Sequence, residues 1–110
     1  MSETLKVLGQ SAPSATTNTD IYTVGASKVA VVSSIIVCNR GTSTGTFRIA
    51  VRVANAAIAT KHYLFYDAPL ASKNTTTISV GMTLATTDVV TIYASSGDFS
   101  FNIFGSEVDV

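Results

Sequence analysis

Apolar and polar residues alternate along much of the chain, with the period of β-strands and not of helices. The clearest case is the segment 46–54. One side of it is apolar (Phe47, Ile49, Val51, Val53), and the other side carries Arg48 and Arg52. Because β-branched residues are frequent here, we expect a strand with its apolar side in a core and both arginines facing outward.

The segment 28–38 is apolar on both sides. One predicted side holds Val29, Val31, Ile35 and Val37, and the other holds Ala30, Val32, Ile36 and Cys38. A strand that is apolar on both sides is expected at the centre of a sheet, between a core and a second covered surface. The residues 39–45, NRGTSTG, are rich in turn formers and predict a hairpin that joins this strand to the next.

Further strands are predicted around residues 21–24, 61–68, 74–80, 88–94 and 99–104, separated by turn signals at 25–27, 81, 87–88 and 95–98. Short strands at such regular intervals are typical of sandwiches and barrels. The expected fold is therefore all-β, an antiparallel, jelly-roll-like β-sandwich of about seven to eight short strands.

The N-terminal segment TLKVLGQ alternates weakly and is followed by the small and polar stretch SAPSATTNT. Two alternatives remain open for residues 1–19. They are either an arm that pairs with the sheet edge of a neighbouring chain, or a first strand and linker of the same sandwich. Residues 20–110 form the predicted sandwich domain.

Charge is low and balanced, with seven basic and seven acidic residues among 110 and 46% hydrophobic residues. The charges are scattered, so neither nucleic acid nor an anionic membrane is an expected partner. No signal peptide and no membrane span is expected. A weakly charged, apolar-leaning surface promotes association, so we expect an oligomer.

Catalysis and metal binding are not expected. His62 is the single histidine and Cys38 the single cysteine, and neither lies in a nucleophile or zinc motif. We expect a structural or interfacial histidine and a small buried thiol. The acidic residues Asp88, Asp98, Glu107 and Asp109 form no dense calcium loop. The chain is thus predicted to be no enzyme and to carry no cofactor.

Protein contact is the chemistry that the residues favour. The candidate interface residues are Leu5, Val7 and Leu8 in the N-terminal segment and the two outward arginines, Arg48 and Arg52. An outward arginine pair is either solvated surface or a set of bidentate anchors for a subunit contact, and both alternatives remain open.

Several phrases of the sequence resemble short virion proteins of tailed bacteriophages, including those of cyanobacteria and marine bacteria. The phrases are KVLGQSAPSATTNTDIYTV, VVSSIIVCNRGTSTGTFRIAV, KHYLFYDAPL, GMTLATTDVVTIYAS and FSFNIFG. The resemblance implies a β-sandwich component of the virion, assembled in the host cytoplasm.

Within that group, the resemblance implies first a capsid cement or decoration protein. Such a protein binds at capsomer junctions as an oligomer, with a homotrimer expected, and its partners are its own copies and the major capsid protein or another virion protein. The alternative is a subunit of the tail, neck or fibre apparatus, with possible receptor contact.

Overall fold

The structure is a computed structural model that describes residues 2–79 and 81–110. In this part the chain forms nine strands and two short 3-10 turns. The strands are β1 (Glu3–Ser11), β2 (Thr19–Thr23), β3 (Lys28–Asn39), β4 (Gly45–Arg52), β5 (Tyr63–Leu70), β6 (Thr75–Ile78), β7 (Met82–Leu84), β8 (Val89–Ala94) and β9 (Phe99–Asp109). The turns η1 (Val53–Asn55) and η2 (Thr60–His62) lie between β4 and β5.

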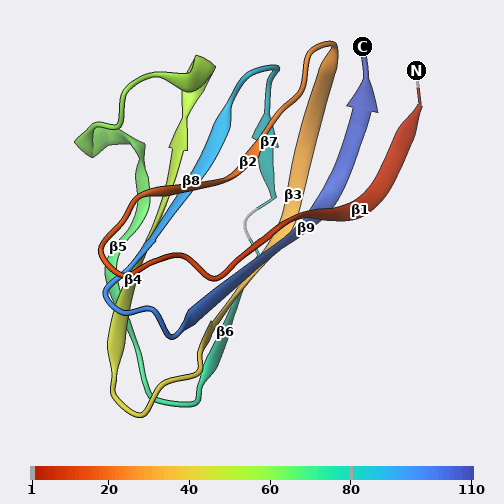
Figure 1. Ribbon diagram of the computed structural model, residues 1–110. Helices are drawn as coiled ribbons and strands as arrows, with labels where there is room; N and C mark the ends of the chain where they lie inside the picture. Colours follow the sequence, from red (N-terminus) through yellow and green to blue (C-terminus); the bar gives the residue numbers. More distant parts are fainter. Residues whose placement is uncertain (1, 80) are drawn as a thin grey trace.

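The strands form two antiparallel sheets that pack face to face (Figure 1). Sheet A has the order β1-β9-β3-β6, with β7 also paired to β3, and sheet B has the order β2-β8-β4-β5. The pairs are nested, since β1 pairs with β9, β2 with β8, β3 with β6 and β7, and β4 with β5. This is the topology of a jelly roll with β6 and β7 sharing one position, so the predicted all-β antiparallel sandwich is confirmed.

The core lies between the two sheets and is built from the inward side of each alternating strand. Four phenylalanines meet there, because Phe47 packs against Phe65, Phe99 and Phe101 with ring centroids 6.0 to 6.4 Å apart. Branched side chains such as Ile35, Ile49, Ile92 and Ile103 fill the remaining space and are fully buried. The two apolar inner faces thus cover each other.

β3 is central in sheet A, as predicted, because it lies between β9 on one side and β6 and β7 on the other. The predicted sides were wrong in one respect. A β-bulge between Val32 and Ser34 adds one residue to β3 opposite β9, and it exchanges the two sides of the strand at that point. Ala30 and Val32 before the bulge therefore share the core with Ile35 and Val37 after it.

The predicted hairpin over residues 39–45 was wrong. β3 belongs to sheet A and β4 to sheet B, so the segment crosses from one sheet to the other. The buried Asn39 holds this crossing: its side-chain nitrogen donates to the carbonyls of Ser43 and Leu70, at 2.9 and 3.0 Å, and its side-chain oxygen accepts from the amide of Gly41. The composition of residues 39–45 correctly indicates a turn. It does not distinguish a turn between two sheets from a turn within one sheet, because both use the same residue types.

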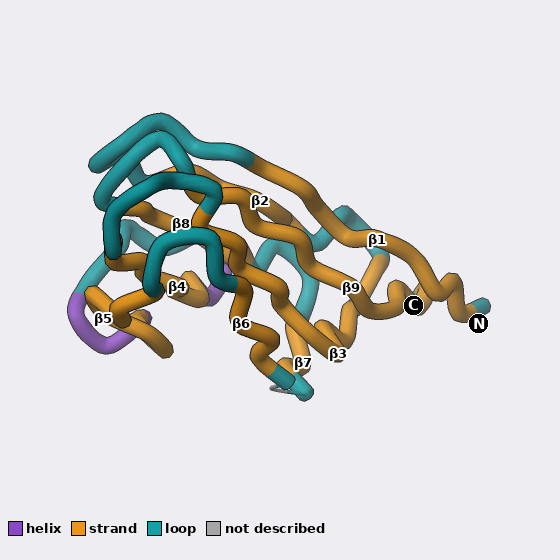
Figure 2. The backbone as a smooth tube through the Cα atoms, turned by 90° about the horizontal axis from the view of Figure 1, so that it is seen from below, coloured by secondary structure: helices purple, strands orange, loops and turns teal. Residues whose placement is uncertain are grey.

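The N-terminal segment forms the edge strand β1 and pairs with β9 of the same chain, which is the second of the two alternatives for it. The two chain ends consequently lie next to each other at one end of sheet A (Figures 1 and 2). Figure 2 also shows β1, β9 and β3 side by side over much of the length of the sheet. β9 is longer than the predicted strand over residues 99–104. It continues to Asp109 and pairs with β3 and β1 along this extension.

Candidate functional site

The side of sheet A that faces away from the core carries a set of apolar side chains among serine, asparagine and other polar residues, and the described residues leave it partly uncovered. We call this set the apolar outer face; it consists of Leu5, Val7, Val29, Val31, Ile36, Phe104 and Val108. Leu5 is 80% exposed, Val7 45% and Val31 38%. Exposed apolar side chains gathered on one surface mark an interaction site more often than scattered ones do.

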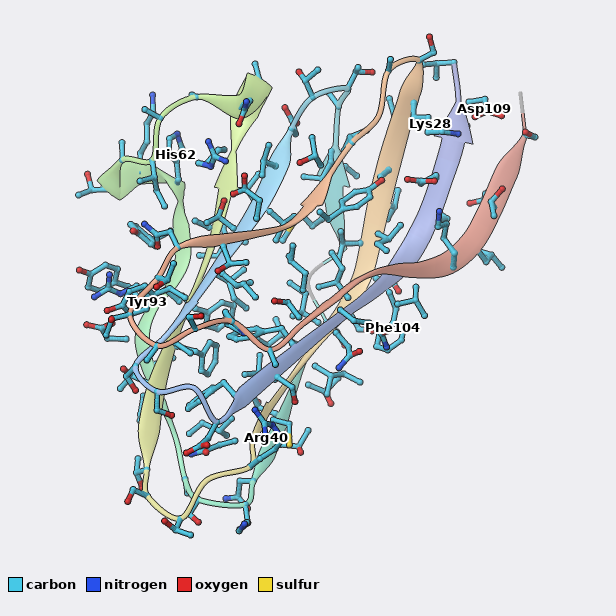
Figure 3. All side chains as sticks on the ribbon, in the orientation of Figure 1. Lys28, Arg40, His62, Tyr93, Phe104 and Asp109 are labelled. Carbon is cyan, nitrogen blue, oxygen red and sulfur yellow. The ribbon has the colours of Figure 1, made fainter. Side chains whose placement is uncertain are left out.

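Strand register places these residues next to one another across three strands. Leu5 of β1 is opposite Ser106 of β9, and Ser106 is opposite Val31 of β3. In the neighbouring row, Val7 is opposite Phe104. Figure 3 shows Phe104 on the side of sheet A that points away from sheet B. The apolar outer face therefore spans β1, β9 and β3, with Ser106 of β9 and Ser34 of β3 lying between its apolar side chains.

Charge is nearly absent from this face because the charged residues of β1, β3 and β9 lie mostly on the other side. Lys6 pairs with Glu107 at 3.2 Å, and Lys28 pairs with Asp109 at 2.6 Å. The strand register places both pairs on the inward side of sheet A, which is the side of the buried Ala30. Among the outward residues of β1, β3 and β9, only Glu3 is charged.

The candidate interface residues of β1 separate into two groups. Leu5 and Val7 belong to the apolar outer face, whereas Leu8 is buried in the core of its own chain. The cause is a register shift between Val7 and Gly9, which turns Leu8 toward sheet B. Leu8 is therefore unavailable for contact with another chain, and its assignment to an interface was wrong.

The two arginines of β4 face outward on sheet B, as predicted, but both are held by their own chain. Arg48 lies between the rings of Tyr66 and Tyr93, with its guanidinium carbon 4.2 and 4.1 Å from the ring centroids. Its Nε donates to Asp67 at 2.7 Å, and this hydrogen bond raises the pKa of Arg48. We call Arg48, Tyr63, Tyr66, Asp67 and Tyr93 the arginine–tyrosine cluster.

Arg52 organises the other end of the same face. Its guanidinium donates to Asp20 at 2.9 Å, to the hydroxyl of Thr91 at 3.0 Å and to the carbonyl of Ala56 at 2.8 Å. Thr91 in turn donates to the same carboxylate oxygen of Asp20 at 2.9 Å. These bonds tie β2, β4, β8 and the segment after η1 together, so Arg52 has a structural role that sequence reasoning missed.

The tyrosines meet at Arg48 because β5 is irregular. Ile49 is opposite Phe65 while Ala50 is opposite Tyr63, so one extra residue lies in β5 between these pairs. A second irregularity follows before Ala68, where Asp67 has a φ of 52°. Tyr63 and Tyr66 thereby reach the same outer side, although simple alternation predicts opposite sides.

His62 and Cys38 are the remaining candidates for chemistry. The Nδ1 atom of the buried His62 accepts from the amide of Ala59 at 2.9 Å and closes the η2 turn. Cys38 is a free thiol on the outer side of sheet A and only half-buried, which differs from the expected burial. Among the described residues, no group of three or more histidine, cysteine or acidic side chains could hold a metal ion.

Comparison with protein families, curated proteins and solved structures finds no match for this chain. In the part of the chain that the structure describes, no helix has the length and apolar character needed to cross a bilayer. The apolar outer face of sheet A and the arginine–tyrosine cluster of sheet B are the two surface features of the described chain that group side chains suited to binding.

Proposed function

We propose that this chain is a structural protein of a bacteriophage virion, a capsid cement or decoration protein that binds at capsomer junctions as an oligomer. The sequence resemblance is the basis for proposing a virion as the location and a homotrimer as the oligomer. It is also the basis for proposing the partners, which are further copies of this chain and a shell protein. The single observation that supports an assembly role is the apolar outer face, where Leu5 is 80% exposed next to Val7 and Phe104.

Hydrophobic burial supplies the free energy in this proposal. Covering apolar surface contributes about 25 cal/mol per Å², before the cost of ordering the partners is subtracted. Because the outward side of β1, β3 and β9 carries one charged residue, Glu3, contact with another apolar surface requires little desolvation of charge. Many copies on a symmetric shell then add up weak contacts through multivalency.

The edge position of β1 adds a second mode of contact. β1 pairs with β9 on one side only, so its other side presents backbone donors and acceptors over nine residues. A neighbouring strand can add to this edge and at the same time cover Leu5 and Val7.

The first test introduces charge on the apolar outer face. Leu5→Asp and Val7→Asp are expected to weaken self-association at least about tenfold, because each places an ionised carboxylate in the buried contact. Sedimentation velocity over a concentration series measures the change. Val53→Asp is the matched control, since Val53 is 63% exposed but lies in η1, away from sheet A.

Unchanged association of Leu5→Asp and Val7→Asp, with native thermal stability, would remove the apolar outer face from the proposal. The virion setting is tested separately by mass spectrometry of purified phage particles and by a density map of the particle. Absence of the chain from the particles contradicts the virion role. Density on the tail and not at capsomer junctions contradicts the cement role alone.

A further inference from the structure

A hollow in the outer surface next to η2 is lined by residues from two segments that are separate from the apolar outer face. Its volume is about 570 Å³, and its lining consists of Ile58, Ala59, Thr60, Tyr63 and Tyr66. This volume falls in the range of small-molecule sites. We propose that the hollow binds a neutral saccharide, with Tyr63 and Tyr66 as the stacking residues. The inference does not depend on the proposed function.

The two tyrosine rings determine the shape that fits. Their centroids are 4.9 Å apart and their planes meet at 83°, so the rings form a corner and not a parallel slot. A flat base stacks best between parallel rings, whereas a pyranose needs one ring for its apolar C–H side and hydrogen-bonding groups, such as tyrosine hydroxyls, for its own hydroxyls. The corner therefore favours a sugar ring over a planar heterocycle.

Hydrogen-bonding capacity at the hollow is unused by the described residues. Within the described residues, the side-chain hydroxyls of Thr60, Tyr63 and Tyr66 form no hydrogen bond to another protein group. Tyr66 is 59% exposed, although the guanidinium of Arg48 covers one face of its ring. Apolar rings with free hydroxyls beside them match the mixed surface of a saccharide.

The residues that line the hollow carry no charged side chain, and this favours a neutral ligand. Arg48 is already paired with Asp67 at 2.7 Å, and Asp67 keeps 45% of its side chain exposed. The pair lies beside the hollow, next to Tyr66, and offers accessible carboxylate oxygens to hydroxyl donors. A neutral ligand with many hydroxyls fits this arrangement better than a phosphate or a nucleic acid does.

The site is also held in place before any ligand arrives. Arg48 fixes Tyr66 against Tyr93. The bond from the Ala59 amide to His62 fixes the turn that carries Thr60. Groups that are already ordered lose little conformational entropy on binding, and this raises the affinity for a small ligand.

The test presents the purified full chain to an array of neutral oligosaccharides built from glucose, galactose, mannose and N-acetylglucosamine. Saccharides that are retained are then titrated by tyrosine fluorescence, since the chain has four Tyr and no Trp. Tyr66→Ala is expected to weaken binding at least about tenfold, and Tyr66→Phe by no more than about threefold because it keeps the ring.

Leu64→Ala is the control, because Leu64 is 50% exposed and lines a different hollow with Val51 and His62. It is expected to bind like the wild type, as is Leu5→Asp on the other sheet. Retention of no neutral saccharide overturns the inference. Binding that survives Tyr66→Ala in a folded variant, or retention of peptides or proteins at this site instead of saccharides, overturns it as well.

Discussion

Single buried polar residues hold the connections of this sandwich. Asp88, which is 7% exposed, accepts from the amides of Ala54 and Ala85 at 2.9 Å each. Its backbone carbonyl accepts from the amide of Val24 at 3.0 Å. One residue thereby joins η1, the turn before β8 and the segment after β2, in the same way that Asn39 holds the crossing between the sheets.

Replacing Asp88 by alanine is expected to destabilise the fold by about 1–3 kcal/mol, because it leaves two partly buried amides without an acceptor. Urea denaturation followed by circular dichroism measures the loss. Asp98→Ala is the matched control, since Asp98 is exposed and its carboxylate accepts no hydrogen bond within the described chain. Equal stability of the two variants would contradict the role of Asp88.

At the scale of elements, β-bulges decide which residues reach which surface. The bulge in β3 keeps Val32 in the core while Val31 faces outward, and the irregular β5 brings Tyr63 and Tyr66 together. Both candidate surfaces therefore depend on interruptions of the two-residue period. Gly105 lies opposite the bulge in β3, where a Cβ atom would overlap the backbone carbonyl of Val31.

Gly105→Ala is expected to destabilise the protein by about 1–3 kcal/mol, since the overlap is with backbone and cannot be relieved by a rotamer change. Thermal unfolding provides the measurement. Gly97→Ala serves for comparison, because a Cβ atom there meets no other atom within 4 Å, and a change within about 0.5 kcal/mol is expected. A native-like melting temperature for Gly105→Ala would show that the bulge tolerates a side chain.

For the whole molecule, one hydrogen bond connects the two sheets near the chain ends. The hydroxyl of Tyr22 in sheet B donates to the carboxylate of Glu107 in sheet A at 2.6 Å, and Lys6 pairs with the same carboxylate. The bond from Tyr22, together with Lys6, lowers the pKa of Glu107, while burial raises the pKa of Tyr22. The negative charge of Glu107 is thus favoured in the folded state.

A lowered pKa in the folded state has a defined effect on stability. The contribution of Glu107 is fully present above its unfolded pKa of about 4.3, and it is lost as pH falls through the lower pKa of the folded state. Melting temperatures between pH 7 and pH 3 are expected to fall less steeply for Glu107→Gln than for the wild type. Glu3→Gln, at an exposed position in β1, is expected to follow the wild-type curve.

The residue pattern alone was sufficient for the fold class and for part of the candidate surfaces. Alternation predicted Phe47 and Ile49 on the inward side and both arginines on the outward side. The apolar N-terminal segment indicated Leu5 and Val7 as candidate interface residues. These features depend only on the two-residue period of a strand, which is local. The central position of β3 followed from its two apolar sides for the same reason.

Tertiary structure decided everything that depends on pairing between distant strands. It turned Leu8 into the core, sent residues 40–44 from one sheet to the other, and gave Arg48 and Arg52 the partners Asp67 and Asp20. Register shifts and long-range pairs carry no local signature, because the same turn residues and the same alternation are compatible with several pairings. The sequence therefore determined a β-sandwich with an apolar strand surface, and only the packing of the two sheets determined which side chains that surface shows.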